Sequence, residues 1–261
     1  MPPTRNFAAW LPGVHRELEF GPADTPEPGE GELLIEIGDV PFETAAGISN
    51  FYGAVSALIL HLHLDPPSKN PNSLNRTKKV LIWGASSSFG AYAIQIAVHA
   101  GYTVVGVASA HNAQLVKSLG AAQFVDRKST SVAEELASLG PFEAVLAAAD
   151  SAEDQTIIGE ILASQGGGTF LSTMGVREGV KLPDGVTGFF AQFLDDYLDP
   201  KNKEFTQWVW WDYMEDALAT GSIKLLPVVV LGGLSKAQDA WNLLKEGKVS
   251  GRKLVIRPDM D

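Results

Sequence analysis

The feature that most restricts the fold of this chain is an alternation of short β-branched runs with segments of helical period, beginning at Lys79. The runs are almost continuously apolar, as expected for strands that are covered on both faces. Repeated βαβ units of this kind wind a parallel sheet. We therefore predict an α/β fold with a doubly wound parallel sheet, whose five strands lie at 80–83, 103–108, 123–125, 144–148 and 169–172.

Helices are predicted between these strands and after them. Gly101 and Gly120 stand where a glycine just beyond a helix end is expected, and Ser235 stands where an N-cap is expected. The predicted helices lie at 89–100, 113–119, 132–138, 154–163, 204–219 and 235–245. Two further strands, at 33–37 and 253–256, belong to something other than the parallel sheet.

Composition excludes several classes of partner and site. The net charge of −11 disfavours nucleic acid and anionic membranes, because no basic cluster could replace counterions along a polyanion. The absence of cysteine excludes disulfides and thiolate metal sites. Only His61 and His63 have a spacing that suits a metal, and we expect both to be ordinary helix-surface residues, with no metal bound. No apolar segment is long enough to span a bilayer, so we expect a soluble, cytoplasmic protein.

A turn of small residues follows the first strand of the predicted sheet. Gly84-Ala85-Ser86-Ser87-Ser88-Phe89-Gly90 leads directly into a helix, which lets the backbone bend sharply and approach a pyrophosphate. Serine hydroxyls can donate to phosphate oxygens beside the N–H groups of the helix terminus. The alternative is a purely structural turn. The order of strand, turn, helix and second strand favours a Rossmann dinucleotide-binding domain with a cofactor site at Gly84, Ser86, Ser87, Ser88, Phe89 and Gly90.

The residues after the second strand indicate which dinucleotide is bound. A carboxylate near the ribose 2′-hydroxyl is typical of sites for the unphosphorylated cofactor, but the sequence here is Ala108-Ser109-Ala110-His111-Asn112. Ser109, His111 and Asn112 offer neutral donors, and Arg127 offers a positive charge after the third strand. We therefore expect NADP(H).

Four segments resemble a known family: WGASSSFGAYAIQIA, VVGVASAHNAQLVKSLGA, FVDR and VSGRKLVIRP. They are similar to the zinc-independent enoyl reductase and quinone oxidoreductase branch of the medium-chain dehydrogenase/reductase superfamily, most of all to fungal trans-acting enoyl reductases and toxD-like proteins of secondary metabolism. The resemblance extends over 43–258 and includes PGEGELLIEI near the start.

The resemblance implies roles for particular residues. Ser86 to Phe89 would hold the pyrophosphate, and Ser109, His111 and Asn112 would surround the adenosine phosphate. Ser172, Thr173 and Met174 would lie near the nicotinamide, although an ordinary exit from a strand explains them as well. The family commonly has tyrosine where Arg127 stands, so the contact from Arg127 rests on its charge alone.

The resemblance also implies a GroES-like β-barrel beside the nucleotide-binding domain, and most of it is missing here. Residues 37–40 pass almost at once into Pro41-Phe42-Glu43-Thr44-Ala45-Ala46, which resembles the helix that precedes the Rossmann unit. We predict a Rossmann domain at 43–224 and a small residual β appendage of the GroES-like domain from both termini, at 1–42 and 225–261. Its strands would pair with each other, with 7–11, or across a homodimer.

No catalytic residue can be assigned by the resemblance. A helix threonine of the family is replaced, by our placement, by Ala54. The aromatic segment 205–214 is interpreted as helical packing, or alternatively as a cover for apolar surface or the lining of a substrate pocket.

Three functions are compatible with the sequence. The first is an NADPH-dependent reductase of an activated alkene or carbonyl, acting on a small apolar substrate of polyketide origin. The second is a non-redox cyclase or isomerase of a polyketide-type intermediate. The third is a binding protein that senses the cofactor or associates with a synthase.

Overall fold

The computed structural model describes residues 6–24 and 42–257 and divides the chain into two compact units. One unit is Ile48–Leu225, and the other combines Met1–Gly47 with Leu226–Asp261. The strand expected at 33–37 lies outside the described residues. The two units are described separately below.

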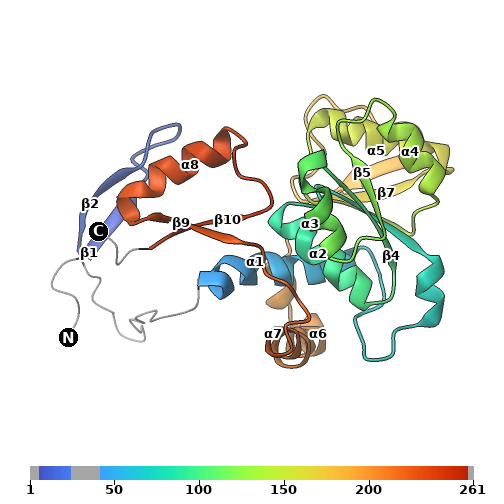
Figure 1. Cartoon of the computed structure of the whole chain (residues 1–261), viewed down its shortest axis with the longest axis horizontal. Helices are drawn as coiled ribbons and strands as arrows, with labels where there is room; N and C mark the ends of the chain where they lie inside the picture. Colours follow the sequence, from blue (N-terminus) through green and yellow to red (C-terminus); the bar gives the residue numbers. More distant parts are fainter. Residues whose placement is uncertain (1–5, 25–41, 258–261) are drawn as a thin grey trace. The chain divides into compact units, whose positions relative to one another are not determined.

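The larger unit contains a six-stranded parallel sheet with the strand order β5-β4-β3-β6-β7-β8. Figure 1 labels β4, β5 and β7 of this sheet together with the helices between its strands. Its strands are β3 (Lys79–Trp83), β4 (Thr103–Ala108), β5 (Gln123–Asp126), β6 (Ala144–Ala147), β7 (Gly168–Ser172) and β8 (Val186–Phe189). The doubly wound α/β fold is thus confirmed, with one strand more than the five expected. The chain leaves β3 toward β4 on one side and later returns to β6 on the other, so the strand order reverses between β3 and β6.

Helices connect the strands as predicted, with ends that differ by one or two residues. They are α2 (Ser88–His99), α3 (Ala113–Ser118), α4 (Val132–Leu139) and α5 (Ala152–Ser164). The glycines expected beyond two of the helix ends have the positive φ that this position requires, 88° at Gly101 and 108° at Gly120. Helix α1 (Phe42–Ser56) precedes the sheet and continues into the π-helix η1 (Ala57–His61).

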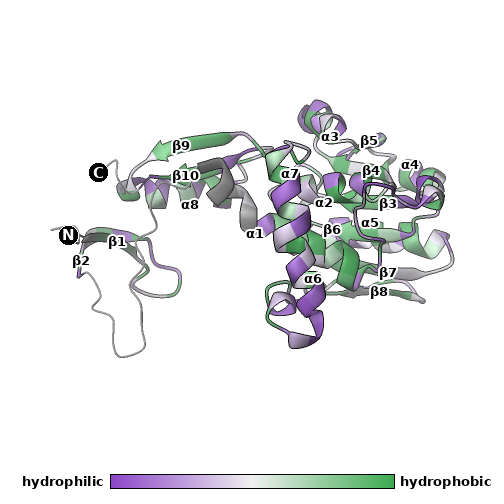
Figure 2. Cartoon of the chain, turned by 90° about the horizontal axis from the view of Figure 1, so that it is seen from below, coloured by the Kyte–Doolittle hydropathy of each residue, from purple (hydrophilic) through white to green (hydrophobic). Residues whose placement is uncertain are grey.

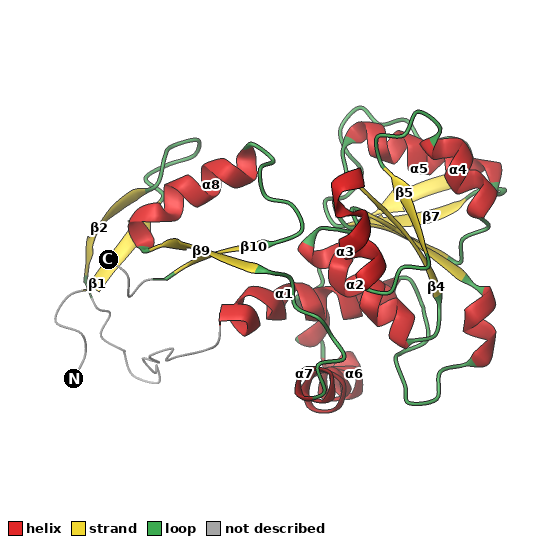
Figure 3. Cartoon of the chain, in the orientation of Figure 1, coloured by secondary structure: helices red, strands yellow, loops and turns green. Residues whose placement is uncertain are grey.

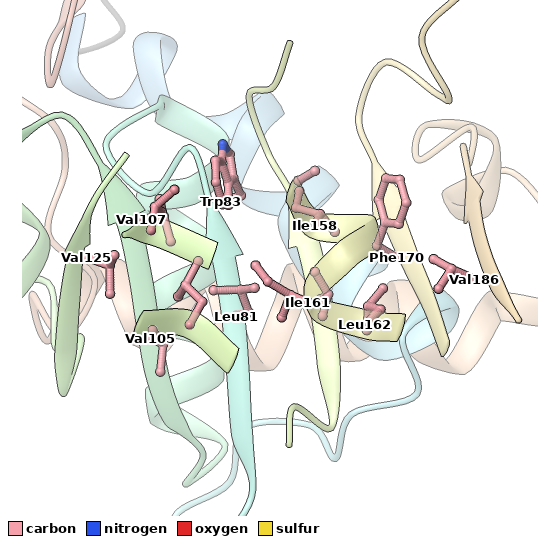
Figure 4. Packing of buried hydrophobic residues seen from close by; sticks show 14 residues of the cluster. Leu81, Trp83, Val105, Val107, Val125, Ile158, Ile161, Leu162, Phe170 and Val186 are labelled. Carbon is pink, nitrogen blue, oxygen red and sulfur yellow. The ribbon is translucent and has the colours of Figure 1, made fainter. Parts of the chain in front are cut away.

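The core of this unit lies between the sheet and the helices α4 and α5. Figure 4 shows Leu81, Val105 and Val107 from the strands together with Ile158 and Ile161 from α5, all at most 1% exposed. Because side chains alternate along a strand, Val80 and Ile82 belong to the opposite face of the sheet, where α2 contacts β3 and β4. Each such aliphatic side chain contributes roughly 1.5–3 kcal/mol by its burial.

The helix expected at 204–219 is not a single α-helix. It consists of α6 (Lys203–Gln207), the π-helix η6 (Trp208–Met214) and α7 (Glu215–Ala219). The wider π-helical turn changes which side chains share a face, so the aromatic residues do not form one buried stripe. Val209 is fully buried, whereas Trp211 is 72% exposed.

In the smaller unit, the described residues form two two-stranded sheets and the helix α8 (Ala237–Lys245). Figure 3 shows their strands in yellow and α8 in red. The strands β1 (Asn6–Trp10) and β2 (Glu19–Ala23) pair antiparallel. The strands β9 (Val228–Gly232) and β10 (Lys253–Ile256) pair in parallel and are joined by α8, which makes a βαβ unit. Strand β9 is drawn mostly in the green of apolar residues in Figure 2.

This pairing corrects two expectations. The strand at 253–256 exists, but within the chain its neighbour is β9, which was not among the predicted strands, whereas the strand Asn6–Trp10 pairs with β2. Ser235 is not the N-cap of α8, because it lies inside the 3-10 turn Leu234–Lys236 and the helix begins after Lys236. No helix among the described residues is long and apolar enough to cross a membrane.

Candidate functional site

The turn between β3 and α2 requires glycine at both of its ends. Gly84 has a φ of 74°, and a Cβ there would lie 2.5 Å from the backbone nitrogen of Ala149. A Cβ on Gly90 would lie 2.4 Å from the carbonyl oxygen of Gly84. The N–H groups of Ala85 and Ser87 donate to Val107 and Gly84, each at 2.9 Å, and hold the turn against β4. The turn therefore packs as closely against its neighbours as a phosphate-binding turn does.

The amino terminus of α2 offers the donors that an anion needs. Ser87 is the N-cap, and its Oγ accepts the N–H of Gly90 at 3.0 Å. The N–H groups of Ser88 and Phe89 are the first two of the helix and have no partner within it. The residues Ser86 to Phe89 are half-buried and not sealed inside the packing. Open N–H groups, serine hydroxyls and the positive end of the helix dipole together suit a pyrophosphate.

The serine turn and the loop after β4 were assigned to the cofactor by separate arguments. In the structure, a hydrogen bond connects them. The Nδ2 of Asn112 donates to the Oγ of Ser86 at 3.0 Å, and Asn112 is buried. Its backbone N–H donates to the carbonyl of Ser109 at 2.8 Å. His111 is exposed beside them. Because β3 and β4 are neighbouring parallel strands, both loops leave the same edge of the sheet.

Arg127 follows β5 at the same edge, but its guanidinium is already engaged. Its Nη2 lies 2.9 Å from Oδ2 of the buried Asp154, near the amino terminus of α5. A contact from Arg127 to the adenosine phosphate would compete with this ion pair. That contact stays a prediction, and the pairing with Asp154 counts against it.

The residues after β7 do not all face the open edge. Ser172 is fully buried and its Oγ donates to Asp150 at 2.7 Å, so its hydroxyl supports the loop and cannot reach a ligand in this arrangement. The Oγ1 of Thr173 donates to the carbonyl of Ala148 at 3.2 Å. Met174 is 65% exposed, and its side chain is the one available to a ligand.

Sequence reasoning missed the polar residues that hold this edge together. The carboxylate of Asp150 accepts a hydrogen bond from Ser172 and forms an ion pair with Arg177. Separately, Asn50 of α1 donates to the Oγ of Ser88 at 2.9 Å. Single polar residues outside a motif give no signal in the sequence. Ala54, where our placement puts the replaced threonine, is completely buried and carries no polar group.

The expectation that His61 is an ordinary surface residue is wrong. Its Nε2 lies 2.7 Å from Oδ2 of Asp196, which also accepts a hydrogen bond from the fully buried Ser56. Its ring also contacts Phe193, and Phe193 contacts Phe89 with 5.2 Å between ring centroids. His63 is exposed, but it lies after the end of the helix at His61 and not on the helix surface as expected. No group of three or more metal-ligating side chains occurs in the part of the chain that the structure describes.

The aromatic segment borders a separate cavity of about 860 Å³ within the larger unit. Trp208 and Tyr213 stack there with their planes 1° apart, and Nδ1 of His99 lies 3.2 Å from the Tyr213 hydroxyl. Burial lowers the pKa of His99, and a hydrogen bond with the Ser222 backbone opposes that shift. Because α2 runs from the phosphate turn to His99, this cavity lies at the far end of that helix, roughly 17 Å away.

Comparisons with known proteins identify the family of the chain. No protein-family model matches the chain. It is 38% identical over 229 residues to the trans-enoyl reductase himH of Aspergillus japonicus, a match that covers 86% of this chain and 65% of that protein. It is 36% identical over 208 residues to the dehydrogenase azaJ of Aspergillus niger, covering 75% of this chain and 57% of that protein. The chain thus spans less than two thirds of the length of these curated relatives.

Solved structures share the fold. The CurA structure from Vibrio vulnificus, in complex with NADPH, aligns with a TM-score of 0.60 at 21% identity, covering 88% of this chain and 69% of that one. The quinone oxidoreductase of Thermus thermophilus, also described in complex with NADPH, aligns with a TM-score of 0.57 at 20% identity, covering 96% and 77%. Because it is 38% identical to himH over 86% of its length, this chain belongs to the medium-chain dehydrogenase/reductase superfamily, in its trans-enoyl reductase and quinone oxidoreductase-like branch.

Proposed function

We propose that this chain binds NADP(H) at the carboxyl edge of its parallel sheet and reduces an activated alkene or carbonyl in secondary metabolism. The observation that carries the proposal is the hydrogen bond from Asn112 to Ser86, which makes one polar surface of the serine turn and the loop after β4. The names of the fungal relatives, a trans-enoyl reductase and a dehydrogenase, support the reaction class.

The residues at the edge suit the two charged groups of this cofactor. The N–H groups of Ser88 and Phe89, with the hydroxyl of Ser86, would bind the pyrophosphate. Ser109 and His111 would face the 2′-phosphate, and no carboxylate between 108 and 112 would repel it. When bound, the cofactor supplies the hydride, and the protein orients the reactants.

The substrate side of the site is apolar. Met174 after β7 and Phe190 after β8 are 65% and 48% exposed at the carboxyl ends of neighbouring strands. Phe190 contacts Phe193, and Phe193 contacts Phe89 at the start of α2. These side chains favour a small apolar substrate, which we propose to be of polyketide origin. No described residue is assigned as a proton donor.

Calorimetry with NADPH and NADH tests the cofactor, and mass spectrometry of products tests the reaction. We expect tighter binding of NADPH, and a gain of two hydrogens when an enone or an enoyl thioester is supplied with it. Ser109→Asp should reduce the preference for NADPH, because its carboxylate would repel the 2′-phosphate. An absence of binding to either nucleotide would overturn the proposal. A product of unchanged mass formed without NADPH would favour a cyclase or isomerase.

A further inference from the structure

A buried carboxylate lies under the carboxyl edge of the sheet, where the loops after β6 and β7 meet. The side chain of Asp150 is 1% exposed. The Nε of Arg177 binds its Oδ1 at 3.0 Å, and the Nη2 of Arg177 donates to the backbone carbonyl of Asp150 at 2.7 Å. Arg177 therefore holds both the side chain and the main chain of this residue. The side chain of Arg177 is one third exposed, so the pair extends from the interior to the surface.

The second oxygen of Asp150 organises the loop after β7. Its Oδ2 accepts hydrogen bonds from the Oγ of Ser172 at 2.7 Å and from the Nε2 of Gln155 at 3.1 Å. The Ser172 Oγ in turn accepts the N–H of Met174 at 3.2 Å. The carboxylate thus fixes the first residues of the loop through one side chain.

Gln155 fixes the rest of the same loop. Its Nε2 donates to the carbonyl of Gly175 at 2.8 Å, and its Oε1 accepts the backbone N–H of Arg177 at 2.8 Å. Gln155 is fully buried, so these bonds are shielded from water. The backbone from Met174 to Arg177 is consequently held at three points, all connected to Asp150.

This network lies on the side of β3 away from the adenosine loop. The dinucleotide in such a fold crosses the edge where the strand order reverses, which is between β3 and β6 here. With the pyrophosphate at the start of α2 and the adenosine beyond β4, the other half of the molecule extends over β6 and β7. Ala149, the residue before Asp150, packs closely against Gly84 of the phosphate turn. A Cβ on Gly84 would lie only 2.5 Å from the backbone nitrogen of Ala149.

We propose that the Arg177–Asp150 pair is a positioning device for the half of the dinucleotide that carries the nicotinamide. The positive charge of Arg177 compensates the negative charge of the buried Asp150 carboxylate. The carboxylate in turn holds the Ser172–Gly175 backbone in place beside the cofactor. Removing Arg177 would leave a buried charge without its partner, and the loop would rearrange to solvate it. The adenosine half, held at β4, would not be affected. This inference rests on the proposed NADP(H) site.

Two probes separate the halves of the site. NADPH occupies both halves, whereas 2′,5′-ADP occupies only the adenosine half. In calorimetry on the full chain, we expect Arg177→Met to weaken NADPH binding about tenfold and to leave 2′,5′-ADP binding unchanged. Arg177→Lys keeps the charge but cannot bind the side-chain and main-chain oxygens of Asp150 together, and it should give an intermediate loss. Lys78→Met is the matched control, because it breaks the exposed ion pair with Glu143, which lies at the amino ends of the strands and away from the proposed site.

A second variant separates charge from packing. Adding Asp150→Asn to Arg177→Met removes the uncompensated charge, so it should recover part of the lost NADPH affinity. Equal losses for the two probes, or no loss with NADPH, would overturn the positioning role while leaving the nucleotide site intact. If the unaltered protein binds neither probe, the proposed function fails and this inference fails with it.

Discussion

At the scale of single residues, Gly90 gives the sharpest test of the phosphate turn. Alanine favours a helix more than glycine does, but a Cβ here would lie 2.4 Å from the Gly84 carbonyl oxygen and 3.0 Å from the Ala85 Cα. Both are main-chain atoms that cannot move aside easily. We expect Gly90→Ala to lower the free energy of unfolding by about 1–3 kcal/mol and to weaken NADPH binding.

Urea unfolding followed by circular dichroism measures this loss. Gly21→Ala is the control, because a Cβ at Gly21 has nothing within 4 Å and should leave stability almost unchanged. If Gly90→Ala were as stable as the original protein, the turn could not be packed as described.

His99 gives a prediction on pH. Burial holds its pKa below the ordinary 6.5, so the folded protein favours the neutral imidazole. As the pH falls below about 6.5, His99 is protonated in the unfolded chain before it is protonated in the folded protein. The free energy of unfolding therefore decreases from about pH 6.5 down to the pKa of His99 in the folded protein. Above about pH 7 the contribution is fully present. We expect the unfolding free energy to fall as the pH decreases below about 7, and His99→Gln to reduce this slope.

Urea titrations at several pH values, on the original protein and on His99→Gln in parallel, measure the slope. A slope that is identical with and without His99 would contradict the role of its burial.

The site residues show which contacts a sequence can predict. Ser86 and Asn112 belong to short motifs that follow neighbouring parallel strands, so their proximity followed from the fold. Asp150 and Arg177 belong to no motif, and their pairing depends on how two loops pack. The burial of Ser172 was missed for the same reason, because its chain position alone does not say which way its hydroxyl points.

At the scale of elements, most strands of the parallel sheet were predictable from the sequence, but the edge strand β8 was not. The strands β3, β4 and β6 are nearly continuous apolar runs, which the pattern of alternation identifies. Strand β5 lies at the other edge of the sheet and was predicted from the short run that contains Phe124 and Val125. Strand β8 contains Thr187 and Gly188 and lies at the edge of the sheet, with only Val186 buried, so its signal is weak. The pairing of β9 with β10 depends on a crossover through α8, which hydrophobic periodicity does not reveal.

The amino terminus of α5 provides a prediction at this scale. Ser151 and Asp154 form a capping box, in which the Ser151 Oγ accepts the Asp154 N–H and Asp154 Oδ2 accepts the Ser151 N–H. We expect Ser151→Ala to lower the free energy of unfolding by about 0.5–2 kcal/mol, measured by urea denaturation. Ser164→Ala at the other end of the same helix is the control and should cost less. Equal losses at the two ends would show that the cap contributes nothing specific.

At the scale of the whole molecule, the larger unit contains every residue that we assign to the proposed cofactor site. The core cluster, the six strands, the serine turn and the Asp150 network all lie within Ile48–Leu225. Helix α1 contributes Asn50 to the turn, so a fragment must begin before the start of this helix at Phe42. We expect a fragment of residues 41–225 to unfold cooperatively and to bind 2′,5′-ADP with the affinity of the full chain.

Thermal unfolding followed by circular dichroism, with calorimetry on the same samples, measures both properties against the full chain. A single cooperative transition is expected because a domain with its own apolar core can fold alone. Unchanged 2′,5′-ADP affinity is expected because Ser86, Ser109 and Asn112 lie inside the fragment, together with the strands that position them. A gradual transition would mean that the fragment does not fold cooperatively by itself. Loss of binding with the fold retained would mean that residues outside 41–225 complete the nucleotide site. The adenosine half of the site would then have to be assigned anew.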